Sequence, residues 1–208
     1  MILDLHNHSI KSDDSRAKVE NYCQWIRKRD LPIDGFALSE HRQFDSESDY
    51  RPLEDEYGLL ILKASEVETD YGHVLVYGVN EDMVAAFDFS RIDLPLSLVV
   101  EEVRRCGGIA VPCHPGRTRV GMVAHVHQRG SVEGVEVIEV LNGGSRGTEN
   151  DEAGHLAEEY GYRGIGGSDA HIVSHIGRCA THFEEPIESI EELVSALQHG
   201  GYRALRPA

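Results

Sequence analysis

Short apolar runs typical of β-strands recur along the chain and alternate with segments of helical period. Eight runs are rich in β-branched and other apolar residues, and we expect strands over residues 2–8, 35–41, 59–66, 73–78, 108–114, 135–142, 164–169 and 180–184. Between them, apolar residues recur at positions i, i+3, i+4 and i+7 in four segments, which begin at Val19, Leu96, Ala153 and Ile190. Buried strands that alternate with amphipathic helices predict a parallel α/β sheet, closed or open.

The first of these runs ends in two histidines. Side chains alternate across a strand, so Asp4, His6 and His8 share one face, while Leu3 and Leu5 share the other. Two imidazoles that point the same way can offer two nitrogens to one metal ion. The simpler alternative is a pair of solvated histidines at the end of a strand.

His, Asp and Glu residues also close several later runs. His41, Glu66, His114 and Asp169 each stand at the carboxyl end of an expected strand, and His171 follows closely. In parallel α/β proteins, and in βα-barrels above all, the carboxyl ends of the strands gather on one face, where sites are built. We therefore expect these side chains to converge with the two histidines of the first strand.

Length and composition favour a single domain over residues 1–208, because 208 residues with 40% hydrophobic residues can form one sizeable core. No apolar run approaches the roughly 20 residues that span a bilayer, and the N-terminus shows no signal-peptide pattern, so we expect a cytoplasmic protein without a membrane partner. The four cysteines, which we expect to be small buried apolar residues, lack CxxC spacing and are Cys23, Cys106, Cys113 and Cys179.

The charge of the chain is strongly acidic. Lys plus Arg number 20 against 36 Asp plus Glu, a formal net charge of −16, which repels the phosphate backbone of nucleic acid at long range. On this ground we expect no binding to duplex nucleic acid. The 12 histidines are the outlier in composition, and those inside apolar runs lie mostly toward the ends of those runs.

Seven short motifs, spread over almost the whole chain, carry a resemblance to a known family. In order, they are residues 4–9 (DLHNHS), 12–14 (SDD), 39–41 (SEH), 65–67 (SEV), 72–75 (GHVL), 114–116 (HPG) and 167–171 (GSDAH). This ordered set resembles the motifs of the PHP (polymerase and histidinol phosphatase) phosphoesterases. The resemblance implies an α/β fold, a distorted (β/α)7 barrel with a metal site at the C-terminal ends of the strands.

The resemblance also implies two to three divalent metal ions, Zn, Mn or Fe, and a hydroxide that bridges them as the nucleophile. The implied ligands are His6, His8, Glu66 and Asp169 for the first ion, Glu66, His73 and His114 for the second, and Asp13, His41 and His171 for the third. Glu66, Asp169 and His171 are the implied catalytic residues. Two alternatives stay open, because Asp14 neighbours Asp13 and because Glu68 shares a strand face with Glu66.

Three arginines are candidates for substrate binding, because each lies on a segment that follows a ligand-bearing strand: Arg42, Arg117 and Arg178. A guanidinium can bind a phosphate through two parallel N–H bonds. An exposed arginine without a ligand is the alternative for each. Glu139 and Asn142, on the run 135–142, are candidates for orienting the ligand imidazoles.

These features predict a metal-dependent phosphoesterase that acts on a small anionic phosphoester, nucleotide-like or histidinol-phosphate-like. One alternative is C–N bond hydrolysis in an amidohydrolase-type barrel, which also uses a His-x-His strand. Another is an inactive module that serves as a scaffold or binding partner. The chain departs from the family pattern at Ser39-Glu40-His41, where the family usually has Thr-Asp-His, but this change removes no ligand. The sequence does not decide the substrate, the metal or the oligomeric state.

Overall fold

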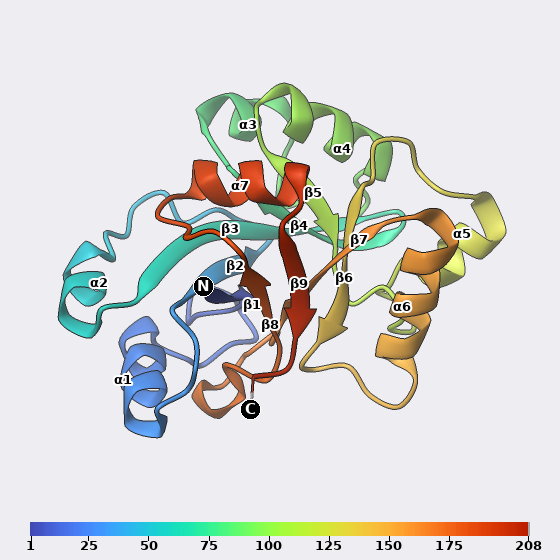
Figure 1. Ribbon diagram of the computed structural model, residues 1–208. Coiled ribbons are helices and arrows are strands. Elements are labelled where there is room, and N and C mark those ends of the chain that lie inside the picture. Colours follow the sequence, from blue (N-terminus) through green and yellow to red (C-terminus); the bar gives the residue numbers. More distant parts are fainter. Residues whose placement is uncertain (208) are drawn as a thin grey trace.

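A computed structural model describes residues 1–207 of the chain, and its strands form two sheets with helices around them (Figure 1). The larger sheet has seven strands in the order β5-β4-β3-β2-β1-β8-β9, and a second sheet pairs β6 with β7. The strands are β1 (Ile2–Asn7), β2 (Gly35–His41), β3 (Leu60–Thr69), β4 (Gly72–Tyr77), β5 (Ile109–Pro112), β6 (Val137–Asn142), β7 (Arg163–Gly167), β8 (Ala180–Phe183) and β9 (Tyr202–Leu205). The helices are α1 (Val19–Arg29), α2 (Arg51–Tyr57), α3 (Glu81–Ala86), α4 (Leu96–Arg105), α5 (Val123–Arg129), α6 (Glu149–Tyr160) and α7 (Ile190–His199), with a 3-10 turn over Val173–His175.

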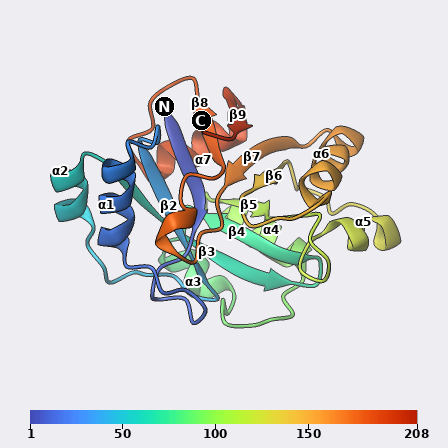
Figure 2. The same cartoon turned by 90° about the horizontal axis from the view of Figure 1, so that it is seen from below.

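The two sheets together form the distorted α/β barrel that the sequence predicted. β6 packs beside β5, one end strand of the curled seven-stranded sheet, and β7 packs beside both β1 and the other end strand, β9, so the pair β6 and β7 closes the sheet into a barrel. Backbone hydrogen bonds continue this contact just past the strands, from the Asp169 N–H to the His6 carbonyl at 2.7 Å and from the His8 N–H to the Ala170 carbonyl at 2.9 Å. Figure 2 shows the same arrangement from below, with β8 and β9 alongside β1 near both termini.

The larger sheet is mixed, which corrects the expectation of a parallel sheet. β1, β2 and β3 are parallel, but β4 is antiparallel to both β3 and β5. β3 also continues three residues beyond Glu66, and in this longer hairpin Glu68 lies opposite His73. The antiparallel direction therefore brings the first residues of β4, rather than its last, to the rim where β1, β2 and β3 end.

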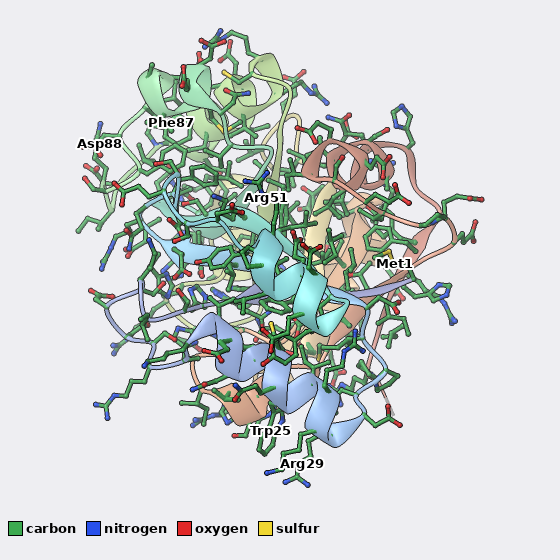
Figure 3. The ribbon with its side chains drawn as sticks, turned by 90° about the vertical axis from the view of Figure 1, so that its left-hand side faces the viewer. Met1, Trp25, Arg29, Arg51, Phe87 and Asp88 are labelled. Carbon is green, nitrogen blue, oxygen red and sulfur yellow. The ribbon has the colours of Figure 1, made fainter. Side chains whose placement is uncertain are left out.

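The four predicted helices form where the apolar period placed them. In α1 the buried residues are Val19, Tyr22, Cys23 and Ile26, the face that the spacing indicated. Figure 3 shows Trp25 and Arg29 on the outer side of this helix, where the Arg29 guanidinium lies 4.6 Å from the centre of the Trp25 ring. Apolar burial on one face thus docks the helix on the sheet.

Three helices and one strand were not predicted, namely α2, α3, α5 and β9. They are short, with 7, 6, 7 and 4 residues, so none offers the two turns or the alternation that a periodic pattern needs. α2 has no fully buried residue. Within residues 1–207, no helix combines the length and the apolar character that crossing a membrane requires.

Candidate metal centre

The two histidines of β1 point into one buried cluster. His6 and His8 are 0% exposed, and their Nε2 atoms lie 3.1 Å apart. The Glu66 Oε2 atom of β3 lies 3.0 Å from His6 Nε2 and 3.1 Å from His8 Nε2. The alternative of solvated histidines at a strand end is therefore excluded by their burial.

Glu66 lies at the centre of the cluster. Its Oε1 atom is 2.7 Å from Nδ1 of His73 and 3.1 Å from Nε2 of His114, while Oε2 faces the β1 histidines and lies 3.5 Å from Nδ1 of His41. The competing residue, Glu68, points elsewhere and pairs with the Arg42 guanidinium at 3.0 Å. Glu66 and Glu68 lie on the same face of β3, so the alternation along the strand does not separate them. Contacts with the neighbouring strands decide which of the two carboxylates reaches the histidines.

Asp169 completes the first predicted ligand set. Its Oδ1 atom lies 3.5 Å from His6 Nε2 and 3.4 Å from His8 Nε2, and Oδ2 accepts a bond from the Arg117 guanidinium at 2.6 Å. The residue has a φ of 52°, an uncommon left-handed conformation outside glycine. Asp4, which the alternation placed on the histidine face, instead accepts the backbone N–H groups of Ser168 and Gly177, both at 2.8 Å, and so supports the segment around Asp169.

The third predicted set needs one correction. Nε2 of His41 and Nε2 of His171 lie 3.4 Å apart, and the carboxylate that reaches them is Asp14, whose Oδ2 is 3.4 Å from the first and 3.1 Å from the second. Asp13 instead pairs with the Arg42 guanidinium at 2.9 Å. The loop after β1 turns the two adjacent side chains in different directions, and sequence position alone could not distinguish them.

Cys113 is also part of the cluster, where the sequence indicated only a small buried residue. It is fully buried as expected, but its Sγ lies 3.4 Å from both Glu66 Oε1 and His114 Nε2. The lack of CxxC spacing concealed this position, because its contact with Glu66 comes from another strand. The four cysteines are free.

A second layer of polar side chains orients the imidazoles, as the sequence predicted for Glu139 and Asn142. Glu139 is fully buried, and its Oε1 lies 3.0 Å from His6 Nδ1, while its Oε2 accepts the His114 backbone N–H at 2.8 Å. Asn142 donates to the same Oε2 at 2.8 Å. Binding of Nδ1 by a carboxylate leaves Nε2 of His6 directed at the cluster, the usual arrangement of a metal-binding histidine.

A similar support for His8 was missed in the sequence. The Ser12 hydroxyl donates to the Glu40 carboxylate at 2.6 Å and lies 3.3 Å from His8 Nδ1. Because the hydroxyl proton is used by Glu40, the serine oxygen can accept from His8 Nδ1–H, which keeps Nε2 directed at the cluster. Glu40 stands at the position where the sequence departs from the family, and it is 1% exposed.

Of the three predicted substrate arginines, two are engaged with carboxylates. Arg117 contacts Asp169 and donates to the Asn142 amide oxygen at 2.7 Å, and Arg42 bridges Asp13 and Glu68. Arg178 is exposed, and its backbone N–H donates to the Ser168 hydroxyl at 2.8 Å. The structure thus brings Arg117 into the centre through a ligand carboxylate.

The charges of the cluster are strongly coupled. Burial favours a raised pKa for Glu66, but the charge of His6 and hydrogen bonds from His114, His6 and His73 hold that pKa well below its usual value. Burial opposes protonation of His8, yet hydrogen bonds to Asp169 and Glu66 raise its pKa to about 9. Burial dominates at His41 and lowers its pKa to about 4. The carboxylates therefore attract positive charge to the centre of the cluster.

The donor set fits divalent transition metals. Four overlapping groups have their ligand atoms within 4.8 Å of one another: His6, His8, Glu66 and Asp169; His6, Glu66, Cys113 and His114; His8, His41 and His171; and His41, Glu66 and His73. In a tetrahedral site with metal–nitrogen distances of 2.0–2.1 Å, two nitrogens lie about 3.3 Å apart, close to the separation of the β1 Nε2 atoms. Imidazole with carboxylate suits Zn, Fe or Mn.

Comparison with known proteins supports the resemblance that the sequence motifs indicated. A family model described as PHP-associated matches residues 147–201. The uncharacterized protein MJ0417 of Methanocaldococcus jannaschii is 27% identical over 193 residues, which cover 89% of this chain and 71% of that protein. A proposed metal-dependent phosphoesterase from Bifidobacterium adolescentis has the same fold, with a TM-score of 0.58 and 15% identity over 81% of this chain and 87% of that one. These matches support the resemblance of the chain to the PHP-domain family.

Other solved structures share the fold of this chain. PsfC from Pseudomonas syringae has a TM-score of 0.72 and 18% identity, and the match covers 98% of this chain and 90% of PsfC. The lesion-specific endonuclease Q from Pyrococcus furiosus has a TM-score of 0.69 and 15% identity, and the match covers 98% of this chain but only 57% of the endonuclease. An amidohydrolase from Chromobacterium violaceum has a TM-score of 0.64 and 18% identity over 99% of this chain and 98% of that one.

The endonuclease corrects one expectation from the sequence. A structure of endonuclease Q contains a 27-mer duplex with an abasic lesion at the active site, and this chain matches 58% of that chain with a TM-score of 0.67. Acidic net charge was therefore a wrong reason to exclude duplex nucleic acid for a protein of this fold. Net charge describes the long-range field, whereas binding depends on the local charge at the groove and on cations in the site.

Proposed function

We propose that this chain is a metal-dependent phosphoesterase that hydrolyses a phosphomonoester or phosphodiester, with a nucleotide-like or histidinol-phosphate-like compound as the substrate. The observation that carries the proposal is the group His6, His8, Glu66 and Asp169, whose ligand atoms lie within 4.8 Å of one another in a fully or almost fully buried cluster. Glu66 belongs to two further groups, so one carboxylate can serve adjacent ions. Enzymes that hydrolyse phosphoesters commonly use adjacent divalent ions bound in this way.

We assign the metal ligands from the predicted set with Asp14 in place of Asp13. They are His6, His8, Asp14, His41, Glu66, His73, His114, Asp169 and His171. Divalent ions bound here supply Lewis-acid polarisation of a phosphoryl oxygen and lower the pKa of water. Zn, Mn and Fe all suit these donors.

The protein itself contributes orientation. Glu139 holds the His6 ring through Nδ1, and Ser12 with Glu40 holds the His8 ring in the same way, so both Nε2 atoms are directed inward before any ligand arrives. Arg117 fixes Oδ2 of Asp169 and leaves Oδ1 toward the β1 histidines. Such preorganisation removes the cost of ordering these groups during the reaction.

Phosphate binding is assigned to arginines that follow the ligand-bearing strands. Arg178 follows His171 by seven residues and is exposed, so its guanidinium can turn toward an incoming phosphate. Arg42 pairs with Asp13 and Arg117 pairs with Asp169. An anionic substrate can replace these carboxylates or bind the same guanidinium beside them. A guanidinium forks two phosphate oxygens, which favours phosphoesters over uncharged amides. The Bifidobacterium adolescentis protein and endonuclease Q, which have the same fold, support the assignment to phosphoester hydrolysis.

The experiment is metal analysis of protein purified without chelator, together with a substrate panel. We expect two or three metal equivalents per chain, and activity on a phosphoester that is lost on chelation and returns with Zn, Mn or Fe. The panel includes phosphomonoesters, phosphodiesters and amides, because an amidohydrolase shares the fold and C–N hydrolysis is the competing reaction. One equivalent at most after reconstitution excludes the multinuclear centre, and turnover of amides alone excludes the phosphoesterase.

A further inference from the structure

Cys113 occupies a position in the metal centre that the predicted ligand sets leave without a role. Its side chain is fully buried, directly beyond the end of β5. The Sγ atom lies 3.4 Å from Glu66 Oε1 and 3.4 Å from His114 Nε2, and these atoms form one group with His6. No other cysteine belongs to a metal-like group within residues 1–207.

The backbone at the next residue explains how two neighbours reach the same point. Successive side chains of a strand point to opposite faces, so Cys113 and His114 would normally diverge. His114 instead has a φ of 32°, a sparsely populated conformation for any residue but glycine. This turn directs both side chains to Glu66, and the surrounding structure maintains it through the bond from the His114 N–H to the Glu139 carboxylate at 2.8 Å.

The separations match those around a single ion. With Zn–S near 2.3 Å and Zn–N of 2.0–2.1 Å, a tetrahedral site places sulfur about 3.5 Å from nitrogen and nitrogen about 3.3 Å from oxygen. The observed distances are 3.4 Å for Cys113 Sγ to His114 Nε2 and 3.1 Å for His114 Nε2 to Glu66 Oε1. A hydrogen bond from the thiol to Glu66 accounts for one of these distances, and a shared ion accounts for both.

We infer that Cys113 is a further ligand of the second ion, the one assigned to Glu66 and His114, and this assignment rests on the metal centre proposed above. As the sulfur binds, the S–H bond breaks and the proton leaves to solvent, so the ligand is a thiolate. A thiolate is a soft donor, which directs this position toward zinc and away from manganese, an ion suited to oxygen ligands. The ion bound by Cys113 therefore occupies a position that prefers zinc to manganese.

The test is the absorption spectrum of the cobalt-loaded protein. Co²⁺ bound by a thiolate shows an intense sulfur-to-cobalt charge-transfer band in the near ultraviolet, whereas nitrogen and oxygen ligands give only weak visible bands. We expect the band in the wild type and in the control Cys23→Ala, whose buried cysteine lies on α1 away from the centre. We expect it to disappear in Cys113→Ser and Cys113→Ala, together with a fall of about tenfold or more in the affinity for zinc relative to manganese.

A second variant keeps the test independent of folding at position 113. The triple substitution of Cys23, Cys106 and Cys179 by alanine leaves Cys113 as the sole thiol, and the charge-transfer band should remain. If the wild type shows the visible cobalt bands but no charge-transfer band, the thiol only donates a hydrogen bond to Glu66 and is not a ligand. The proposed metal centre would then be retained without Cys113. No cobalt binding at all would overturn the metal centre and this inference together.

Discussion

Glu66 is the side chain on which the metal groups converge, and it is 0% exposed between histidines of four segments. We predict that Glu66→Gln removes most bound metal and activity, because an amide withdraws the negative charge that adjacent cations share. Glu68→Gln is the matched control, since this carboxylate contacts Arg42 instead. Metal content and turnover are measured side by side. Equal losses in the two variants would mean that the choice of Glu66 over Glu68, two residues further along β3, is wrong.

Asp14 and Asp13 are adjacent carboxylates with different partners, which makes them another matched pair. Asp14→Asn should release part of the metal bound near His41 and His171, because its Oδ2 lies 3.4 and 3.1 Å from their Nε2 atoms. Asp13→Asn should retain the wild-type metal content, since it removes only an exposed pair with Arg42. Elemental analysis decides between them. Metal loss in Asp13→Asn alone would restore the assignment made from the sequence.

Arg117 is bound to a ligand carboxylate, whereas Arg178 is exposed, so the two arginines should give different signatures. Arg117→Ala should reduce metal content as well as kcat/KM, because Asp169 loses its partner on Oδ2. Arg178→Ala should leave metal content intact and lower kcat/KM by a factor that corresponds to about 1.5–3 kcal/mol, the contribution of a charged hydrogen bond. Arg117→Lys should recover only part of the loss, because lysine lacks the planar fork. Full metal content in Arg117→Ala would assign that residue to substrate binding alone.

At the scale of elements, an ion pair between the exposed Lys11 and the buried Asp45 joins the loop after β1 to the loop after β2. Asp45 is 6% exposed and accepts bonds from Lys11 Nζ and the Tyr50 hydroxyl, each at 2.8 Å. Burial favours a raised pKa for Asp45, but the bonds from Lys11, Ser48 and Tyr50 hold that pKa well below its usual value. The pair thereby connects the loop that carries Asp14 to the one that follows His41.

This arrangement predicts a pH-dependent contribution to stability. A carboxyl whose pKa is lower in the folded state stabilises the protein above its unfolded pKa, and the contribution is lost as the pH falls through the folded value. Asp45→Asn should therefore cost about 1–3 kcal/mol of unfolding free energy at pH 7, and less as the pH falls below about 4. Urea unfolding in chelator keeps metal binding out of the comparison. The exposed Asp49, which pairs with Arg51, is the control, and a cost for Asp45→Asn that grows toward low pH would contradict the account.

At the scale of the whole molecule, the barrel closes where β7 meets β1, and this contact leaves no room for a side chain. A Cβ on Gly167 would lie 2.4 Å from the His6 Cβ and 2.8 Å from Glu139 Oε1. We predict that Gly167→Ala costs about 1–3 kcal/mol of stability, as overpacking does, and lowers metal content by displacing His6. Unfolding midpoints and elemental analysis measure both effects.

The matched control for this closure is Gly154→Ala, in the middle of α6, where an added Cβ meets nothing within 4 Å. Alanine there should stabilise the helix by about 0.5–1 kcal/mol and leave metal content unchanged. A stable, fully loaded Gly167→Ala protein would show that His6 does not depend on the contact between β7 and β1.

The amino-acid sequence by itself predicted the elements that have a strong period and the polar side chains near strand ends that the fold brings together. The buried face of α1 is the one that the spacing of Val19, Tyr22, Cys23 and Ile26 indicated. Local patterns suffice here, because alternation and helical period depend only on neighbours along the chain. The ordered motifs indicated the resemblance to the PHP family from the same local information. Short elements such as α2 and β9 carry too few residues for a period to emerge.

Only the tertiary structure decided which of two similar residues reaches the centre. Asp14 rather than Asp13 approaches the histidines, and Cys113 joins Glu66, because loop conformation and the left-handed turn at His114 orient these side chains. The antiparallel direction of β4, which brings His73 to the rim, likewise comes from pairing with β3 and not from any pattern within β4. These outcomes depend on contacts between residues distant in sequence, and a local pattern carries no information about such contacts.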